Sequence, residues 1–357
     1  MKRCNLINRF ASIVLTSLVI AMAGSCEHKE LCYYHPHTAP VKVNVDWSRF
    51  PMEDPTGMTA YSYLVGGKEN KVFRMISHNI DYITLDLEAG FFNTIVFNQS
   101  ESEYGSFEFV NLDDYSSAQV RVLQVKSNWY VSKATDTKVG TEPEWLAVGR
   151  AEKIEVTEEM VKIAEKEYLD QHKDIISRSG TRSVHEVATI TPTSVVKQVE
   201  FNVFAKGLYN LRSARAAMEG MTEGRYLSTG KPFTSEVAHT LDTWSVVTEP
   251  NDPASGYITS IVSTFGLPEG HSGDPKENKF SISLLLVDNK TVLTYDYYIG
   301  DLLTALNELS DIEEKIVINL EIPERLPDVL PVGGSGGGFS ADVDDWGDEI
   351  TTEIPIM

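Results

Sequence analysis

The stretch VKVNVDW, residues 41–47, decides the fold class because its apolar and polar residues alternate without a break. In an extended chain the three valines and Trp47 point to one face, and the polar residues between them point to the other. Alternation with a period of two predicts a β-strand that is buried on one face and solvated on the other.

The same pattern recurs in short β-rich runs on both sides of a charged helix. Six runs separated by turn-rich segments precede the helix: TAYSYLV, VFRMIS, YITLDL, NTIVFN, FEFVN and AQVRVLQV. A second series follows it and includes VEFNVFA, YITSIVSTF, FSISLLLVD, TVLTYDYYI and KIVINLEI. Short strands at this spacing predict antiparallel β-sandwiches rather than alternating βαβ units.

Helices are predicted among the strands, the shortest being one to two turns in IGDLLTALNEL, residues 299–309. In residues 156–173, Thr157 is placed to cap a helix whose first turn carries two glutamates, which the helix dipole favours. In residues 210–220, NLRSARAAMEG, Asn210 is placed as a cap and Gly220 as the residue that ends a second, shorter helix. The sequence therefore predicts a mainly β fold, with two tandem antiparallel β-sandwiches and a few short helices.

Changes of composition divide the chain. The basic segment SRSGTRS, around Gly180, marks the predicted boundary between an N-terminal sandwich domain at 38–185 and a C-terminal sandwich domain at 186–330. Residues 331–357 are a Gly-rich linker and an acidic tail. The sequence leaves open whether this tail is disordered or docks its last part, residues 349–356, as a strand.

The N-terminus has the three parts of a secretory signal, which predicts that residues 1–25 are a lipoprotein signal peptide. Basic residues come first, an apolar run spans residues 11–23, and small residues lead to Cys26. This order resembles a bacterial lipobox, which predicts cleavage before Cys26 and lipidation of its thiol. Two or more acyl chains attach a protein stably to a membrane. Residues 26–37 are then a tether between the lipid and the first domain.

Cysteine usage leaves no pair for a disulfide. Cys4 is removed with the signal and Cys26 carries lipid, so Cys32 is the one thiol left in the mature sequence. The rival interpretation is a metal site formed by Cys26, His28, Cys32, His35 and His37. Zinc ligands usually come in close pairs on separate turns, and this spacing matches none of the common patterns. We therefore predict no metal and no other cofactor.

Charge and motifs exclude several classes of function. A formal charge of −21 opposes binding to phosphate, so we predict no nucleic-acid partner. It also repels anionic headgroups, so attachment to a membrane must be hydrophobic or covalent. The sequence has no Gly-x-Ser-x-Gly elbow, Walker loop or His-Glu-x-x-His motif, and we predict that the protein is not an enzyme. Trp129, Trp145 and Trp244 are candidate platforms for sugars, although most tryptophans in sandwiches are core residues.

Four stretches carry a resemblance to a known family: CEHKELCYYHPH followed by VNVDW, then LDLEAGFFNTIVFN, ITPTSVVKQVEFNVFAKGLYNLRSARAAMEGM and GGGFSADVDDW. The sequence resembles the Bacteroidales fimbrillin-like lipoproteins, in particular the fimbrial anchor and minor-subunit group and a closely related uncharacterised lipoprotein family. Glu27 and Glu30 resemble the acidic surface-export signal of Bacteroidales lipoproteins. The resemblance implies two transthyretin-like sandwiches, which lipid at Cys26 holds on the outer membrane at the cell surface. It also implies subunits that join by strand complementation.

These observations lead to one leading hypothesis and one alternative. We predict a non-enzymatic surface lipoprotein that acts as an anchor or accessory subunit of a fimbria-like (type V pilus) fibre and aids adhesion. Its expected partners are the outer membrane, through the lipid anchor, and pilin-like subunits. The alternative is a surface lipoprotein that binds a glycan or another host ligand and has no fibre partner.

Overall fold

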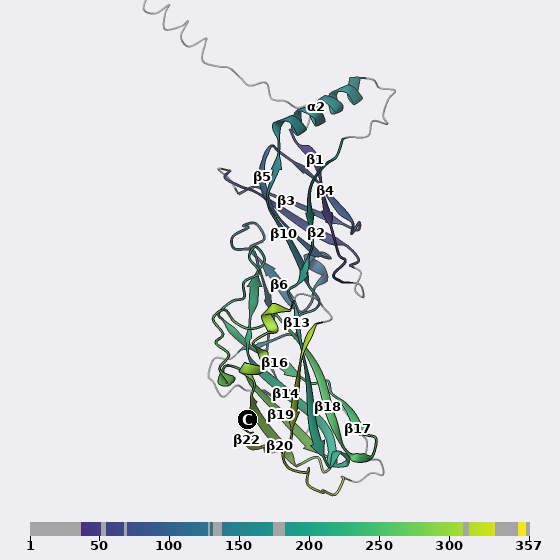
Figure 1. The fold of residues 1–357 in the computed structure, drawn as a ribbon, viewed down its shortest axis with the longest axis vertical. Coiled ribbons are helices and arrows are strands. Elements are labelled where there is room, and N and C mark those ends of the chain that lie inside the picture. The colour runs from purple at the N-terminus through teal and green to yellow at the C-terminus, as the bar shows by residue number, and fades with distance from the viewer. Residues whose placement is uncertain are drawn as a thin grey trace, which may run out of the picture.

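The computed structural model describes residues 37–50, 55–67, 70–127, 129–130, 138–173, 183–309, 314–332 and 349–354. In these ranges the chain is mainly β, and two β-sandwiches follow one another along the long axis of the molecule (Figure 1). The helix α2 (Glu158–Lys173) lies at the far end of the first sandwich. None of the helices in these ranges is long and apolar enough to cross a membrane.

The first sandwich packs a three-stranded sheet against a five-stranded sheet. The strand orders are β11 (His185–Ile190), β1 (Ala39–Val45), β4 (Tyr82–Leu87) in one sheet, and β12 (Thr193–Ser194), β10 (Ala147–Val156), β5 (Gly90–Asn98), β2 (Met58–Leu64), β3 (Val72–Ser77) in the other. The sheets enclose one apolar cluster, to which β1 contributes Val41 and Val43, both 0% exposed. Burial of these alternate residues confirms the strand predicted at residues 41–47.

The second sandwich packs a four-stranded sheet against a seven-stranded sheet. The four-stranded sheet has the strand order β17 (Ser245–Glu249), β18 (Asp252–Thr264), β13 (Lys197–Lys206), β21 (Lys315–Glu321). The seven-stranded sheet has the strand order β22 (Glu349–Ile354), β20 (Val292–Tyr298), β19 (Lys279–Leu286), β14 (Leu211–Thr222), β16 (Glu236–Leu241), β9 (Lys138–Gly140), β8 (Gln124–Val125). The two sheets meet at Phe201 on β13 and Phe280 on β19, whose rings stack with centroids 4.0 Å apart.

A third sheet joins the two sandwiches. Its three strands have the order β15 (Gly224–Tyr226), β7 (Gln119–Val122), β6 (Phe107–Val110). Phe109 stacks on Phe97 of the first sandwich, with centroids 4.7 Å apart, and Phe107 meets Phe265 of the second edge to face at 5.7 Å. Buried residues of both sandwiches therefore belong to one continuous apolar cluster, which opposes hinge motion between them.

The helices agree with the sequence in one place and differ in another. Thr157 caps α2, because its Oγ1 accepts a hydrogen bond from the Met160 amide at 3.3 Å. The helix predicted at residues 210–220 is wrong, because residues 211–222 form strand β14. Elsewhere in the described ranges the helical segments are short 3-10 turns: η1 (Glu101–Glu103), η2 (Leu208–Asn210), η3 (Pro275–Glu277), η4 (Gly300–Leu303) and η5 (Leu306–Glu308).

Strand β14 is extended because it lies between β19 and β16 in the seven-stranded sheet and pairs with both. These two ladders outweigh the helix preference of its alanines. Gly220 lies at a break in the ladder between Met218 and Met221, with a φ of 80°. A Cβ there would lie 2.1 Å from the carbonyl oxygen of Glu277, so this glycine serves a bulge and a close backbone approach rather than the end of a helix.

The mainly β fold of two sandwiches with few helices is confirmed. Among the described strands, four pairs are parallel, namely β1 with β11, β13 with β21, β16 with β9 and β20 with β22, and the other pairs are antiparallel. Strand β11 begins at His185 and pairs with β1 of the first sandwich. The predicted domain bounds at 38–185 and 186–330 stay a prediction.

Candidate functional site

The residue predicted to carry lipid, and those considered in the rival interpretation as metal ligands, lie near the N-terminus. Cys26, Cys32, His28 and His35 are outside the described residues, so lipidation of Cys26 stays a prediction. Within the described ranges, no three His, Cys, Asp or Glu side chains are grouped as ligands for a metal ion.

The three tryptophans considered as sugar platforms are engaged by other parts of the protein. Trp244 is 7% exposed, and its Nε1 donates to a backbone carbonyl at 3.0 Å. Trp145 packs edge to face on Phe50, with 5.5 Å between the ring centroids. The Arg215 guanidinium lies over the ring of Trp129, 4.4 Å from its centroid. Each of the three tryptophans therefore makes contacts within the protein that account for its place in the fold.

One edge of the seven-stranded sheet is covered by the C-terminal strand of the same chain. Strand β22 pairs in parallel with β20, from Glu349 opposite Val292 to Ile354 opposite Tyr297. Figure 1 shows β22 beside β20 near the C-terminal end of the chain. The sequence left open whether this part of the tail is disordered or docks as a strand, and in the structure residues 349–354 dock as a strand. The β20 edge therefore accepts an extended segment through main-chain pairing.

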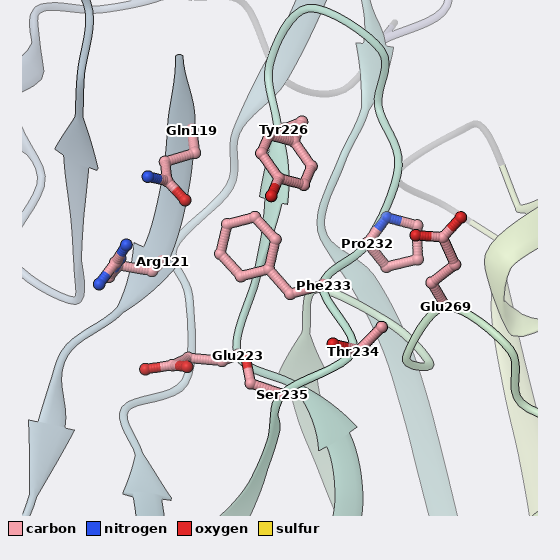
Figure 2. A pocket seen from close by; sticks show the side chains of 9 residues that line it. All are labelled: Gln119, Arg121, Glu223, Tyr226, Pro232, Phe233, Thr234, Ser235 and Glu269. Atoms are coloured by element: carbon pink, nitrogen blue, oxygen red, sulfur yellow. The ribbon is translucent and has the colours of Figure 1, made fainter. Parts of the chain in front are cut away.

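A pocket of about 290 Å³ opens on the sheet that joins the two sandwiches (Figure 2). Its lining includes Gln119 and Arg121 from β7, Tyr226 from β15, and Phe233 from the segment that follows. Glu223, just before β15, and the more distant Glu269 add acidic groups, and Pro232, Thr234 and Ser235 complete the lining. In Figure 2, Gln119, Arg121 and Glu223 lie to one side of the two aromatic rings, and Pro232 and Glu269 lie to the other.

The strand register explains how these side chains meet. Gln119 pairs with Tyr226 and Arg121 pairs with Gly224, so the four positions share one face of the sheet. Gly224 has no side chain and leaves room for the Phe233 ring, because a Cβ at Gly224 would lie 2.8 Å from Phe233 Cε2. The missing side chain brings the aromatic wall close to Arg121.

Hydrogen bonds hold the segment 227–235 against β15. The Phe233 amide donates to the Gly224 carbonyl at 2.9 Å. On the opposite face of the strand, Arg225 Nη1 donates to the Gly230 carbonyl at 3.0 Å. These bonds fix the walls of the pocket without a ligand, which lowers the entropy cost of binding one.

The acidic group in the lining, Glu223, is nearly buried, with a side chain that is 9% exposed. Burial raises the pKa of its carboxyl. Hydrogen bonds from Ser235 and Gln124 lower that pKa, as do the positive charges of Lys138 and Arg121, and the net pKa lies below its ordinary value. Gln124 Nε2 donates to Glu223 Oε1 at 2.7 Å. The pocket therefore presents a carboxylate at neutral pH.

Little in the sequence indicates this pocket. Gln119 and Arg121 are recognisable as the polar alternates of the run AQVRVLQV, which places them on one face of a strand. Their neighbours at 223–235 come about a hundred positions later in the chain, as the 99-residue separation of Gln124 and Glu223 illustrates. No local pattern indicates that pairing.

Comparison with known proteins supports the fold. No curated protein matches the sequence. Among solved structures the chain is similar to a candidate adhesin of Bacteroides ovatus, with 14% identity and a TM-score of 0.53 over 85% of this chain and 99% of that chain. It is also similar to a candidate adhesin of Bacteroides thetaiotaomicron, with 9% identity and a TM-score of 0.48 over 80% of this chain and 92% of that chain. A third similar structure is the fimbrial anchor protein Mfa2 of Porphyromonas gingivalis, with 11% identity and a TM-score of 0.37 over 69% of this chain and 78% of that chain.

The first of these similarities establishes a shared fold, which agrees with the fold that the resemblance to Bacteroidales fimbrillin-like proteins implies. A family model, described as a domain of unknown function (DUF5119), matches residues 25–242. Because this match covers more than half of the sequence, the chain belongs to the DUF5119 family.

Proposed function

We propose that this chain is a non-enzymatic surface lipoprotein that serves as an anchor or accessory subunit of a fimbria-like (type V pilus) fibre and aids adhesion. In this proposal, acyl chains on Cys26 hold the N-terminal end in the outer membrane. Pilin-like subunits bind at a sheet edge in the second sandwich. The Bacteroides ovatus protein that shares this fold is described as a candidate adhesin, and this supports the adhesive part of the proposal.

The observation that carries the proposal is the strand added to β20. β22 is not the hairpin partner of β20, because β21 and a Gly-rich segment separate the two strands in the chain. Their pairing is parallel, so β22 arrives at the edge as an independent extended segment. Main-chain hydrogen bonds in a ladder are the same whether the strand comes from the same chain or from another one. The edge is thus suited to a strand from a neighbouring subunit.

Removing the tail is expected to create a binding site for its own sequence. We expect a chain that ends at Val332 to bind a synthetic peptide of residues 345–357 at least about tenfold more tightly than the full chain does, because a tethered tail competes at an effective concentration near millimolar. Calorimetric titration measures both affinities. The matched control is the same peptide with Thr351 and Thr352 replaced by proline, which cannot donate to the ladder. Equal binding of the two peptides would contradict strand addition.

The fibre role itself is tested in cells. Deleting the gene is expected to change the length of surface fibres or their retention on the cell, measured by electron microscopy and by the amount of fibre shed into the medium. Fibres of normal length and normal attachment would remove the pilus part of the proposal. Strand addition at β20 would then need another partner.

Attachment to the membrane is expected to depend on one thiol. Cys26→Ala should abolish labelling by a fatty-acid probe and move the protein out of the membrane fraction, because in this proposal the acyl chains on that residue are the attachment. Cys32→Ala is the matched control, since it removes a nearby thiol that the proposal leaves unmodified. Membrane fractionation with metabolic labelling measures both. Retention of Cys26→Ala in the membrane fraction would contradict the lipid anchor.

A further inference from the structure

We propose that the pocket on the joining sheet, shown in Figure 2, is a binding site for one neutral sugar ring of a glycan. This proposal does not depend on the fibre role, because the pocket lies on β7 and β15 and strand addition takes place at β20. It would give the protein a direct contact with a carbohydrate surface.

The first argument is an unused hydrogen-bond donor. Arg121 Nε is buried and has no hydrogen-bond partner among the described residues. A buried donor without a partner is costly, and a guanidinium carries five N–H donors and no acceptor. The site therefore favours a ligand that brings oxygen acceptors to Arg121.

The second argument is the carboxylate beside this arginine. Glu223 also lines the pocket, and an ionised carboxylate only accepts hydrogen bonds. A hydroxyl group both donates and accepts, so a ligand with several hydroxyls can accept from Arg121 and donate to the Glu223 carboxylate, which also accepts from Gln124 Nε2 at 2.7 Å. The Gln119 amide offers a further donor and a further acceptor on the same face of β7. This combination matches a polyhydroxylated ligand.

The third argument is the aromatic wall opposite these polar groups. The rings of Tyr226 and Phe233 meet edge to face, with centroids 4.9 Å apart and an interplanar angle of 73°. Tyr226 is 37% exposed, so part of its surface is free to cover a ligand. A sugar ring has hydroxyls at its rim and apolar C–H groups on its faces, and burial of those faces against an aromatic ring is favourable. The pocket presents both kinds of surface within about 290 Å³, near the lower end of the range for ligand sites.

Charge argues for a neutral ligand. An acidic sugar would approach Glu223 and Glu269 in the lining and Glu108, which pairs with Arg121 across the joining sheet. The whole chain carries a formal charge of −21, which adds a long-range repulsion of anions. The ammonium of Lys231, 3.5 Å from the Glu269 carboxylate, balances the charge of that one acidic group and adds no net positive charge to the site. A cationic ligand would be repelled by the positive charge of the Arg121 guanidinium, which has hydrogen-bond donors and no acceptor.

The test is a glycan array probed with the purified full chain, followed by calorimetric titration of the strongest neutral ligand. Arg121→Met keeps the length of the side chain and removes its donors, and we expect at least about a tenfold loss of affinity. Tyr226→Ala removes the exposed part of the aromatic wall, and we expect a similar loss. The matched control is Arg212→Met, the same change at an arginine of β14 that does not line the pocket, and its affinity should be unchanged.

Three outcomes would overturn the proposal. They are the absence of any glycan ligand for the full chain, binding restricted to sialylated or sulfated glycans, and an affinity that neither Arg121→Met nor Tyr226→Ala reduces. Melting curves keep the result interpretable, since Tyr226 is partly exposed and its alanine variant should fold even if Arg121→Met does not. The chain that ends at Val332 should keep its glycan affinity, which separates this site from strand addition at β20.

Discussion

Phe280→Ala is expected to lower the free energy of unfolding by about 3–5 kcal/mol, the usual cost of removing a large aromatic side chain from a packed core. Phe280 is 0% exposed and stacks on Phe201, which is also 0% exposed, with centroids 4.0 Å apart and an interplanar angle of 11°. The two rings come from β19 and β13, so their contact joins the two sheets of the second sandwich. Alanine would leave a cavity between the sheets.

This loss is large relative to the total stability of a folded protein, which is about 5–15 kcal/mol. Urea unfolding followed by tryptophan fluorescence measures it, because the ring of Trp244 lies 6.5 Å from that of Phe280 and reports on the same core. Phe91→Ala is the matched control, since Phe91 is 49% exposed on β5 and its loss should cost less than about 0.5 kcal/mol. Equal costs at the two positions would mean that the sheets are not joined at Phe280.

The position of Phe201 could be predicted from the sequence, because a strand that is buried on one face has apolar residues at alternate positions. In β13 the residues Val199, Phe201, Val203 and Ala205 occupy alternate positions, with Glu200 and Asn202 between the first three, and all four are 0% exposed. The same reasoning found β1 and the capped start of α2. In each case the decisive interaction is burial of a single face, or a side chain bonding to the next turn, and both are visible within ten residues.

Strand β14 could not be predicted this way, because nearly all of it is buried on both faces. Alternation disappears when both faces of a strand are buried, and small residues such as Ala216 and Ala217 then suggest a helix. The information that makes β14 a strand lies in β16 and β19, which pair with it from later in the chain.

The pocket could not be predicted from the sequence for a related reason. Arg121 and Gly224 are ordinary residues until the pairing of β7 with β15 sets them side by side. That pairing is long-range, and its consequence depends on the absence of a side chain at one position. A sequence pattern shows which face of a strand is polar, but it does not show which other polar residues will face it.

Acid is expected to destabilise the second sandwich through one buried histidine. His239 is 0% exposed on β16, where it pairs with Gly140 on one side and Met218 on the other. Its Nδ1 lies 3.2 Å from the Gly140 carbonyl oxygen, which can only accept, so the neutral ring carries its proton on Nδ1. Its Nε2 is buried and has no hydrogen-bond partner among the described residues. A second proton would therefore place an unpaired charge in the core.

Burial lowers the pKa of His239 to about 4, although its hydrogen bond to Gly140 opposes this shift. In the unfolded chain the ordinary value of about 6.5 applies. Between these two values the unfolded state binds more protons than the folded state, so stability is complete above pH 6.5 and falls as the pH is lowered toward 4. The expected loss over this window is about 3 kcal/mol, with a slope near 1.4 kcal/mol per pH unit in its lower part.

The measurement is the free energy of unfolding in urea at a series of pH values between 7.5 and 4, compared with that of His239→Gln. Glutamine can still donate to the Gly140 carbonyl but does not titrate, so its curve should lack most of the slope over this range, whatever its stability at pH 7. His78→Gln, at an exposed histidine, is the matched control and should follow the native curve. If the His239→Gln curve instead runs parallel to the native one, carboxylates elsewhere in this acidic chain cause the acid sensitivity. Protonation of the buried imidazole would then make no contribution to the pH dependence of the free energy of unfolding.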